Sequence, residues 1–246
     1  MNLIKKNYNG IPLYIAENLN SKVMILLFHG FLSSTQRQNE RTEIMEKFYN
    51  AGFSVTAIDS VKHGERADFA EFNKMEYLKK ERELFYIVEE SSKEIDDIID
   101  ILTKEKKINN KKVFCCGLSM GGLISWKAAS NSKIDGAIIM AATPYFKRFA
   151  EYNLERKGDK LTREEIDFLE QIEPFNNIEL LRKKTIFIAS GSEDIIIPSF
   201  FSEEGYKALN KKQNNLNIVY KVYKGGHSDN IEMINGAIKW LLAEVK

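Results

Sequence analysis

Short, mostly apolar runs alternate with helix-like segments along this chain. The runs are four to eight residues long and lie at residues 23–28, 53–58, 113–116, 136–140, 185–190 and 216–223. Such runs are typical of strands that are buried on both faces of a parallel sheet. Segments that read as helices lie at residues 40–50, 84–102, 122–130 and 231–245. The alternation predicts an α/β fold with a doubly wound, mostly parallel sheet, which binds ligands beyond the carboxyl ends of its strands.

The chain length bears on domain organisation. At 246 residues the chain fits one α/β domain covering residues 1–246. Near its start, Asn9 and Gly10 separate two short apolar segments, which predicts an antiparallel hairpin at the sheet edge. The interval between the runs ending at residue 140 and starting at residue 185 is too long for an ordinary connection. We therefore expect residues 144–184 to form a small helical cap inserted into this domain.

Composition excludes several classes of partner and site. Lys plus Arg number 36 and Asp plus Glu number 35, and the charges are scattered, so we expect no nucleic-acid surface. The only cysteines, Cys115 and Cys116, are adjacent in an apolar run, which favours buried thiols over a disulfide or a metal site. Lys5 and Lys6 are not followed by a signal-peptide segment, and no apolar run could span a bilayer. We expect a soluble, cytoplasmic protein that acts on a small molecule.

A serine between glycines follows the third apolar run. Gly-Leu-Ser-Met-Gly at residues 117–121 separates this run from a helix-like segment. At a sharp strand-to-helix turn, this spacing holds the serine in a strained backbone conformation with its hydroxyl exposed above the sheet. The flanking glycines avoid side-chain collisions in the turn. Ser119 is therefore the predicted nucleophile.

A serine hydroxyl needs a base to remove its proton and an acid to orient that base. Of the three histidines, only His227 follows the last predicted strand, as the chain order of serine, acid and histidine requires. The alternative for His227 is a surface loop residue beside a helix cap. Asp194, which follows the run at 185–190, is the predicted acid, and the adjacent Glu193 is the alternative.

Two backbone amides complete the predicted site. Attack on a carbonyl carbon places negative charge on the oxygen, and each fixed N–H group that meets this charge contributes about 3–4 kcal/mol. Met120, directly after the serine, is predicted to supply one donor. Phe31, in His-Gly-Phe at residues 29–31, is predicted to supply the other. Taken alone, the pair His29 and Gly30 also fits an ordinary tight turn.

Taken together, these motifs resemble the α/β-hydrolase superfamily over nearly the whole chain. The matching segments are residues 29–31, 117–122, 226–227 and Gly-x-x-Asp-x-x-x-Pro at 191–198. Asp-x-x-x-His-Gly-x-Arg at 59–66 also resembles a loop of small bacterial esterases of the dienelactone-hydrolase-like and prolyl-oligopeptidase-like branch. Dienelactone hydrolases themselves carry cysteine at the elbow, so their lactone substrate does not transfer to this chain. The resemblance implies an α/β-hydrolase fold and esterase activity with no metal or organic cofactor.

In this family the loop after the second predicted strand lies near the site. We expect His63 to form hydrogen bonds within this loop and Arg66 to brace it, rather than to act as a second base and to bind a substrate carboxylate. Phe69, Phe72 and Tyr77 are candidates for the wall of an acyl pocket or for anchors of the loop to the core. All five residues stay outside the predicted catalytic set.

The predicted cap bears on the substrate. Its first part carries aromatic residues at near-helical spacing, and Thr-Arg-Glu-Glu at residues 162–165 predicts a second helix that starts with a capping box. The aromatic residues are Tyr145, Phe146, Phe149 and Tyr152. A modest apolar cap narrows the approach to the serine, so we expect hydrolysis of carboxylic esters with short or medium acyl chains. A thioesterase, an acyltransferase and a small peptidase stay open because the same triad serves each, and a noncatalytic binding protein is the remote alternative.

Overall fold

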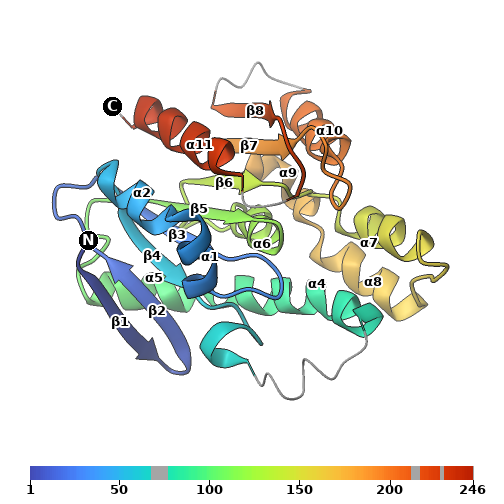
Figure 1. Cartoon of the computed structure of the whole chain (residues 1–246), viewed down its shortest axis with the longest axis horizontal. Coiled ribbons are helices and arrows are strands. Elements are labelled where there is room, and N and C mark those ends of the chain that lie inside the picture. Colours follow the sequence, from blue (N-terminus) through green and yellow to red (C-terminus); the bar gives the residue numbers. More distant parts are fainter. Residues whose placement is uncertain (68–76, 212–216, 228–229, 246) are drawn as a thin grey trace.

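The computed structural model describes residues 1–67, 77–211, 217–227 and 230–245. Within these residues the strands form one eight-stranded sheet with the order β1-β2-β4-β3-β5-β6-β7-β8 (Figure 1). The strands are β1 Leu3–Tyr8, β2 Ile11–Ala16, β3 Val23–Phe28, β4 Ser54–Ile58, β5 Lys112–Leu118, β6 Gly136–Met140, β7 Thr185–Gly191 and β8 Ile218–Tyr223. All neighbours from β4 to β8 pair in parallel. The predicted α/β fold with a mostly parallel sheet is confirmed.

Helices cover both faces of this sheet. They are α1 Thr35–Thr42, α2 Ile44–Asn50, α4 Tyr77–Lys93, α5 Ile95–Lys104, α6 Met120–Ala128, α7 Phe146–Glu155, α8 Arg163–Ile172, α9 Ile178–Leu181, α10 Ser199–Asn210 and α11 Ile231–Glu244, with 3-10 turns at Gly64–Arg66 and Pro174–Asn177. Alternate residues of β3 enter different clusters: Ile25 packs with α2 and α11, whereas Leu26 packs with α4, α5 and α6. The fully buried central strands therefore have two apolar faces, which explains their continuous apolar sequences.

The N-terminal hairpin is confirmed at the sheet edge. β1 and β2 pair antiparallel, and β2 continues the sheet through an antiparallel pairing with β4. Asn9 and Gly10 both have positive φ, at 52° and 86°. This is the backbone geometry of a two-residue turn that matches the twist of a hairpin.

Two segments predicted as single helices are divided. The helix expected at 40–50 is α1 followed by α2, because Glu43 between them has the left-handed φ of 51°. The helix expected at 84–102 begins earlier, at Tyr77, and is interrupted at Glu94 between α4 and α5. In both cases the apolar pattern continues across the break.

Residues between β6 and β7 form α7, α8, the second 3-10 turn and α9. Figure 1 shows α7 and α8 together at one end of the molecule, near α4. The predicted capping box is confirmed: Thr162 Oγ1 accepts a hydrogen bond from Glu165 N–H, and the Glu165 carboxylate accepts one from Thr162 N–H. Throughout the described ranges, no helix is long and apolar enough to cross a membrane.

Candidate active site

Ser119 lies at the sharp turn between β5 and α6. Its backbone has φ 57° and ψ −119°, a conformation that is strained for a residue with a side chain. The flanking glycines make the turn possible: a Cβ on Gly117 would lie 2.2 Å from the backbone of Gly121, and one on Gly121 would lie 2.1 Å from the carbonyl oxygen of Phe28. The two glycines therefore let the chain bring the Ser119 side chain up at the carboxyl end of the sheet.

The structure brings Ser119, His227 and Asp194 together in one line of hydrogen bonds. His227 Nε2 lies 2.8 Å from Ser119 Oγ, and His227 Nδ1 lies 2.8 Å from Asp194 Oδ2. The Asp194 side chain is fully buried, whereas the His227 side chain is one-fifth exposed, at 21%. A carboxylate on Nδ1 fixes the tautomer that leaves the Nε2 lone pair facing the hydroxyl. In this arrangement Nε2 can take the proton of Ser119.

The loop after β7 presents Asp194 rather than Glu193 to the imidazole. Asp194 Oδ1 accepts hydrogen bonds from the N–H groups of Ile196 and Ile197, both at 2.9 Å, which leaves Oδ2 for His227. Glu193 is exposed. Of the two carboxylates considered from sequence, the buried one makes the contact with His227.

The two residues predicted to supply oxyanion donors, Phe31 and Met120, lie in the loop after β3 and at the start of α6. Met120 is the first residue of α6, so its N–H group is one of those that an α-helix does not use internally. Phe31 follows β3, and its ring lines the same cavity as Ser119. The Ser119 N–H group itself donates to Met140 O at 2.9 Å and is therefore occupied. The assignment of the Phe31 and Met120 amides as oxyanion donors stays a prediction.

Two buried histidines support the loops around the site. His29 Nδ1 donates to Gly30 O at 2.8 Å, and its Nε2 accepts from Ser60 N–H at 3.1 Å. His63 Nδ1 donates to Val61 O at 2.9 Å, and its Nε2 accepts from Leu32 N–H at 3.0 Å. Burial lowers the pKa of His29 to about 4 and lowers the pKa of His63 as well. Both rings are therefore neutral hydrogen-bonding braces near neutral pH.

The loop that contains His63 is held by charged side chains. Asp59 accepts hydrogen bonds from Thr35 N–H at 2.8 Å and from Glu65 N–H at 3.0 Å. Arg66 donates to Asp59 O at 3.2 Å and to both carboxylate oxygens of Glu94, at 2.7 and 2.5 Å. These contacts agree with the loop-bracing role expected for Arg66. Phe69, Phe72 and the Tyr77 side chain lie outside the part of the structure that is described.

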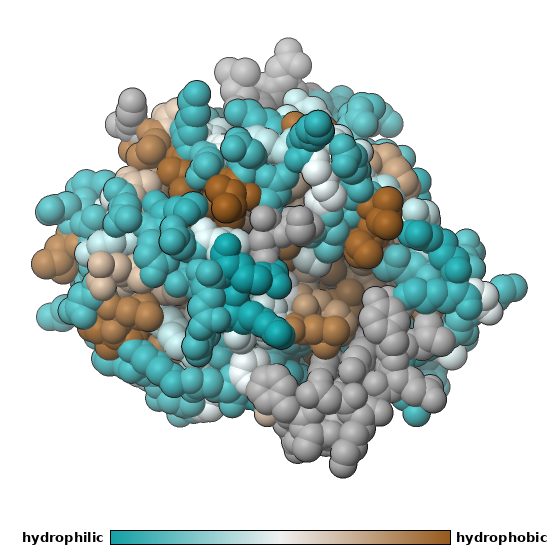
Figure 2. Space-filling model, viewed as in Figure 1, coloured by the Kyte–Doolittle hydropathy of each residue, from teal (hydrophilic) through white to brown (hydrophobic). Residues whose placement is uncertain are grey.

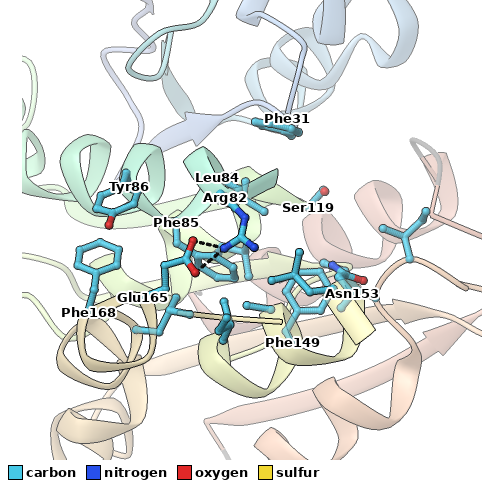
Figure 3. Close-up of a pocket in the computed structure, with 17 residues that line it drawn as sticks. Phe31, Arg82, Leu84, Phe85, Tyr86, Ser119, Phe149, Asn153, Glu165 and Phe168 are labelled. Carbon is cyan, nitrogen blue, oxygen red and sulfur yellow. Dashed lines mark hydrogen bonds and ion pairs between the residues drawn. The ribbon is translucent and has the colours of Figure 1, made fainter. Parts of the chain in front are cut away.

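A cavity opens beside Ser119 and extends under α7 and α8. Its walls come from α4, α6, α7, α8 and the loops after β3 and β7, and most are apolar (Figure 3). They comprise Phe31, Arg82, Leu84, Phe85, Tyr86, Ser119, Leu123, Phe149, Ala150, Asn153, Leu154, Leu161, Glu165, Phe168, Leu169, Ile196 and Ile197. Figure 2 shows that hydrophilic side chains dominate the outer face, with apolar ones in a hollow near its centre. Of the four aromatic residues noted in the predicted cap, Phe149 lines the cavity.

The charged members of the cavity wall are absent from the predicted site. Arg82 belongs to no motif, Glu165 belongs only to the predicted capping box, and each lies on an amphipathic helix where a charged residue ordinarily faces water. Only the folded chain shows that these two residues pair and line the cavity.

Within the described ranges, no group of three or more His, Cys, Asp and Glu side chains is arranged to hold a metal ion. Cys115 and Cys116 are buried and unpaired in β5, as the sequence predicts. Burial raises the pKa of both thiols. The two cysteines are therefore core residues. The polar groups of the candidate site are Ser119, Asp194 and His227, which lie beyond the ends of strands.

Comparisons with known proteins agree with the fold. The structure of TT1662 from Thermus thermophilus has a TM-score of 0.77 at 16% identity, covering 99% of this chain and 98% of that one. The esterase Pf2001 of Pyrococcus furiosus has a TM-score of 0.65 at 18% identity, covering 99% and 90%. An acylaminoacyl peptidase from Pyrococcus horikoshii has a TM-score of 0.67 at 13% identity, covering 98% of this chain and 40% of that one. At these identities the likeness shows a shared fold.

The sequence comparisons give the family. No curated protein matches the chain. A family model described as Hydrolase_4, serine aminopeptidase, S33, matches residues 20–165, which is more than half of the 246 residues. This span includes the loop after β3 and the turn with Ser119. The chain therefore belongs to the Hydrolase_4 family of the α/β-hydrolase superfamily.

Proposed function

We propose that this protein is a carboxylesterase-type serine hydrolase with Ser119 as nucleophile, His227 as general base and acid, and Asp194 as the group that orients His227. The observation that carries the proposal is the line of two 2.8 Å hydrogen bonds through the imidazole. A lone serine in a motif has many structural roles, but a strained serine that meets a carboxylate-bound histidine has the geometry of an activated nucleophile.

In the proposed reaction Ser119 Oγ attacks the carbonyl carbon of an ester while its proton passes to His227 Nε2. The N–H groups of Phe31 and Met120 stabilise the resulting oxyanion. Collapse of the tetrahedral intermediate breaks the bond to the alcohol oxygen, which takes the proton from His227. Water, deprotonated by His227, then attacks the acyl-enzyme, and the carboxylic acid leaves as Ser119 regains its proton.

The apolar cavity supports a small ester as the substrate. Leu123, Phe149 and Leu154 offer apolar contact beside the serine, which suits an acyl chain. The helices between β6 and β7 supply much of this wall, so we assign residues 144–184 as a cap within a single domain that spans 1–246. A short or medium acyl chain is the substrate that we propose.

The family description raises a peptidase as the second candidate. Binding the free amino group of a peptide or aminoacyl amide favours an unpaired carboxylate near the serine. Among the described residues that line the cavity, Glu165 is the only carboxylate, and it is paired with Arg82. This pairing favours an uncharged acyl group over an aminoacyl group.

Two measurements test the proposal. A fluorophosphonate probe should label the wild-type protein and leave Ser119→Ala unlabelled, because the probe reacts with an activated serine. Matched p-nitrophenyl esters, thioesters and aminoacyl amides should show the highest kcat/KM for esters. Folded wild-type protein that fails to label would favour the noncatalytic alternative, and preferred cleavage of thioesters or amides would replace the esterase assignment. We keep the cytoplasm as the proposed compartment on the basis of the two unpaired cysteines.

A further inference from the structure

Part of the cavity wall is an ion pair between α4 and α8, two helices that are far apart in the sequence. Arg82 of α4 reaches across to α8, where its Nη1 contacts both carboxylate oxygens of Glu165. Its Nη2 donates to Asp159 Oδ2 at 2.8 Å and to Lys160 O at 3.0 Å. Two nitrogens of the guanidinium therefore bind acceptors that lie at the start of α8 and in the segment just before it.

Glu165 is fixed from a second direction. Its Oε2 accepts a hydrogen bond from Thr162 N–H at 2.7 Å, and its own N–H donates to Thr162 Oγ1 at 3.2 Å. A capping box that also binds a guanidinium leaves the carboxylate little rotational freedom. The pair is a rigid part of the wall rather than two mobile surface chains.

The Arg82–Glu165 ion pair lies partway along the cavity, away from Ser119. Both residues line it together with Ser119, and in Figure 3 they lie between Ser119 and the rings of Tyr86 and Phe168. Those rings stack on each other with centroids 4.2 Å apart, so α4 and α8 are also in contact beyond the pair. The Arg82 side chain is 25% exposed and the Glu165 side chain 16%. The pair therefore borders both the cavity and solvent.

We propose that the Arg82–Glu165 ion pair is a polar constriction of the acyl pocket and sets the longest acyl chain that the enzyme accepts. This inference rests on the proposed esterase function, with the acyl group in the cavity beside Ser119. An acyl chain gains free energy for each methylene that enters the apolar part of the cavity. At the ion pair this gain ends, because a further methylene must displace a charge-assisted contact or strip water from the charges.

Because several hydrogen bonds hold the ion pair in place, we expect kcat/KM to change abruptly at the longest acyl chain that the pocket accepts. Each methylene that the pocket buries should raise kcat/KM by roughly fourfold, because about 0.8 kcal/mol per methylene corresponds to that ratio. The rise should stop at the chain length that reaches Arg82, and kcat/KM should fall for longer chains. Removing both charges should let a longer chain pass the constriction toward the part of the cavity lined by Tyr86 and Phe168.

The test compares p-nitrophenyl acetate, butyrate, hexanoate, octanoate, decanoate and laurate on the full chain below their critical micelle concentrations. The test variant is Arg82→Ala with Glu165→Gln, because glutamine can keep the capping box at Thr162 and the double change removes both charges of the pair. Asp159 also loses its contact with Arg82, but its side chain is 36% exposed and stays in contact with water. Each value of kcat/KM is divided by that for acetate. We expect the maximum to move to a longer chain in the double variant, with a rise of at least about tenfold for the first ester beyond the wild-type maximum.

Arg148→Ala is the matched control. Arg148 of α7 pairs with Glu204 of α10, so its loss also removes an ion pair between the helices after β6 and the rest of the fold, but Arg148 does not line the cavity. Its chain-length profile should match that of the wild type. An unchanged profile in the double variant, or the same shift in Arg148→Ala, would overturn the inference while leaving the esterase assignment intact. A wild-type protein that hydrolyses none of the esters would overturn both.

Discussion

The backbone N–H of Leu32 donates a hydrogen bond to Nε2 of His63 over 3.0 Å. This contact joins the loop after β3 to the loop after β4. Leu32 has a left-handed φ of 57°, a conformation that costs free energy in a residue with a branched side chain. The neutral ring of His63 therefore helps to hold the loop that carries the Phe31 amide in its strained shape.

His63→Ala should lower kcat for ester hydrolysis by about 10- to 100-fold, because a displaced Phe31 amide loses part of the effect of one oxyanion donor. KM should change less, since the apolar wall of the cavity stays in place. His63→Gln keeps an acceptor that can face Leu32 N–H, so it should recover much of the lost activity. Steady-state kinetics on a single ester check both variants, and wild-type kcat in His63→Ala would refute the positioning role.

Asp194→Asn should lower kcat by about 10⁴-fold, because an amide at this position favours the wrong tautomer of His227. Glu193→Gln is the control, since Glu193 is exposed and its neighbour makes the contact with the imidazole. The kcat of Glu193→Gln should stay within about twofold of the wild-type value, as expected for a substitution at the surface. Comparable losses in the two variants would show that Asp194 has no special role.

Gly121→Ala should destabilise the fold by about 3 kcal/mol or more, because the added methyl group meets the backbone oxygen of Phe28, which cannot turn aside. Gly226→Ala is the comparison, since its nearest atom outside the adjacent residues is the Glu193 carbonyl oxygen at 3.6 Å, an ordinary contact. Thermal unfolding of both variants measures the difference. A melting temperature of Gly121→Ala equal to that of Gly226→Ala would contradict the close packing at the turn.

His29 should make the free energy of unfolding depend on pH. Between pH 6.5 and about 4 the unfolded chain takes up a proton at this residue, whereas the native ring stays neutral because burial lowers its pKa to about 4. The unfolded state then binds more protons, so stability falls as the pH falls. Wild type should lose about 3 kcal/mol more than His29→Gln over this interval. Urea titrations at a series of pH values measure the two slopes, and parallel slopes would argue against a neutral native His29.

Cys115 and Cys116 should react with a thiol reagent such as Ellman's reagent only when the protein unfolds. Both side chains are fully buried in β5, and burial raises the pKa of each thiol, which suppresses the reactive thiolate. The reaction rate in native buffer should rise steeply at the denaturant midpoint. Rapid reaction of the native protein would show that β5 opens locally.

The parallel strands are predictable from sequence because burial on both faces requires an unbroken apolar run. The bounds of β3 and β6 agree with the runs at 23–28 and 136–140. The position of Ser119, Asp194 and His227 at one edge of the sheet is predictable for a related reason: each lies within four residues of the end of a recognisable strand, and carboxyl ends of parallel strands meet at one edge. Their mutual distances, however, come from the tertiary fold alone.

Helix breaks and the cavity wall are less predictable. Glu94 interrupts α4 and α5 without interrupting the apolar pattern, so periodicity carries no sign of the break. Arg82 and Glu165 are 83 positions apart and become neighbours only when α8 packs beside α4. A sequence pattern records which face of a helix is apolar, but it does not record which distant charge that helix will meet.

The parallel pairing of β6 with β7 has a consequence for evolution. The two strands pair directly with each other, from Gly136 with Thr185 to Met140 with Ala189, and Ser119, Asp194 and His227 follow β5, β7 and β8. Helices α7 and α8 supply much of the cavity wall but none of these three residues. Variation in α7 and α8 can therefore change the cavity while the proposed reacting groups keep their places at the strand ends, so a change of selectivity does not require a change of the proposed chemistry.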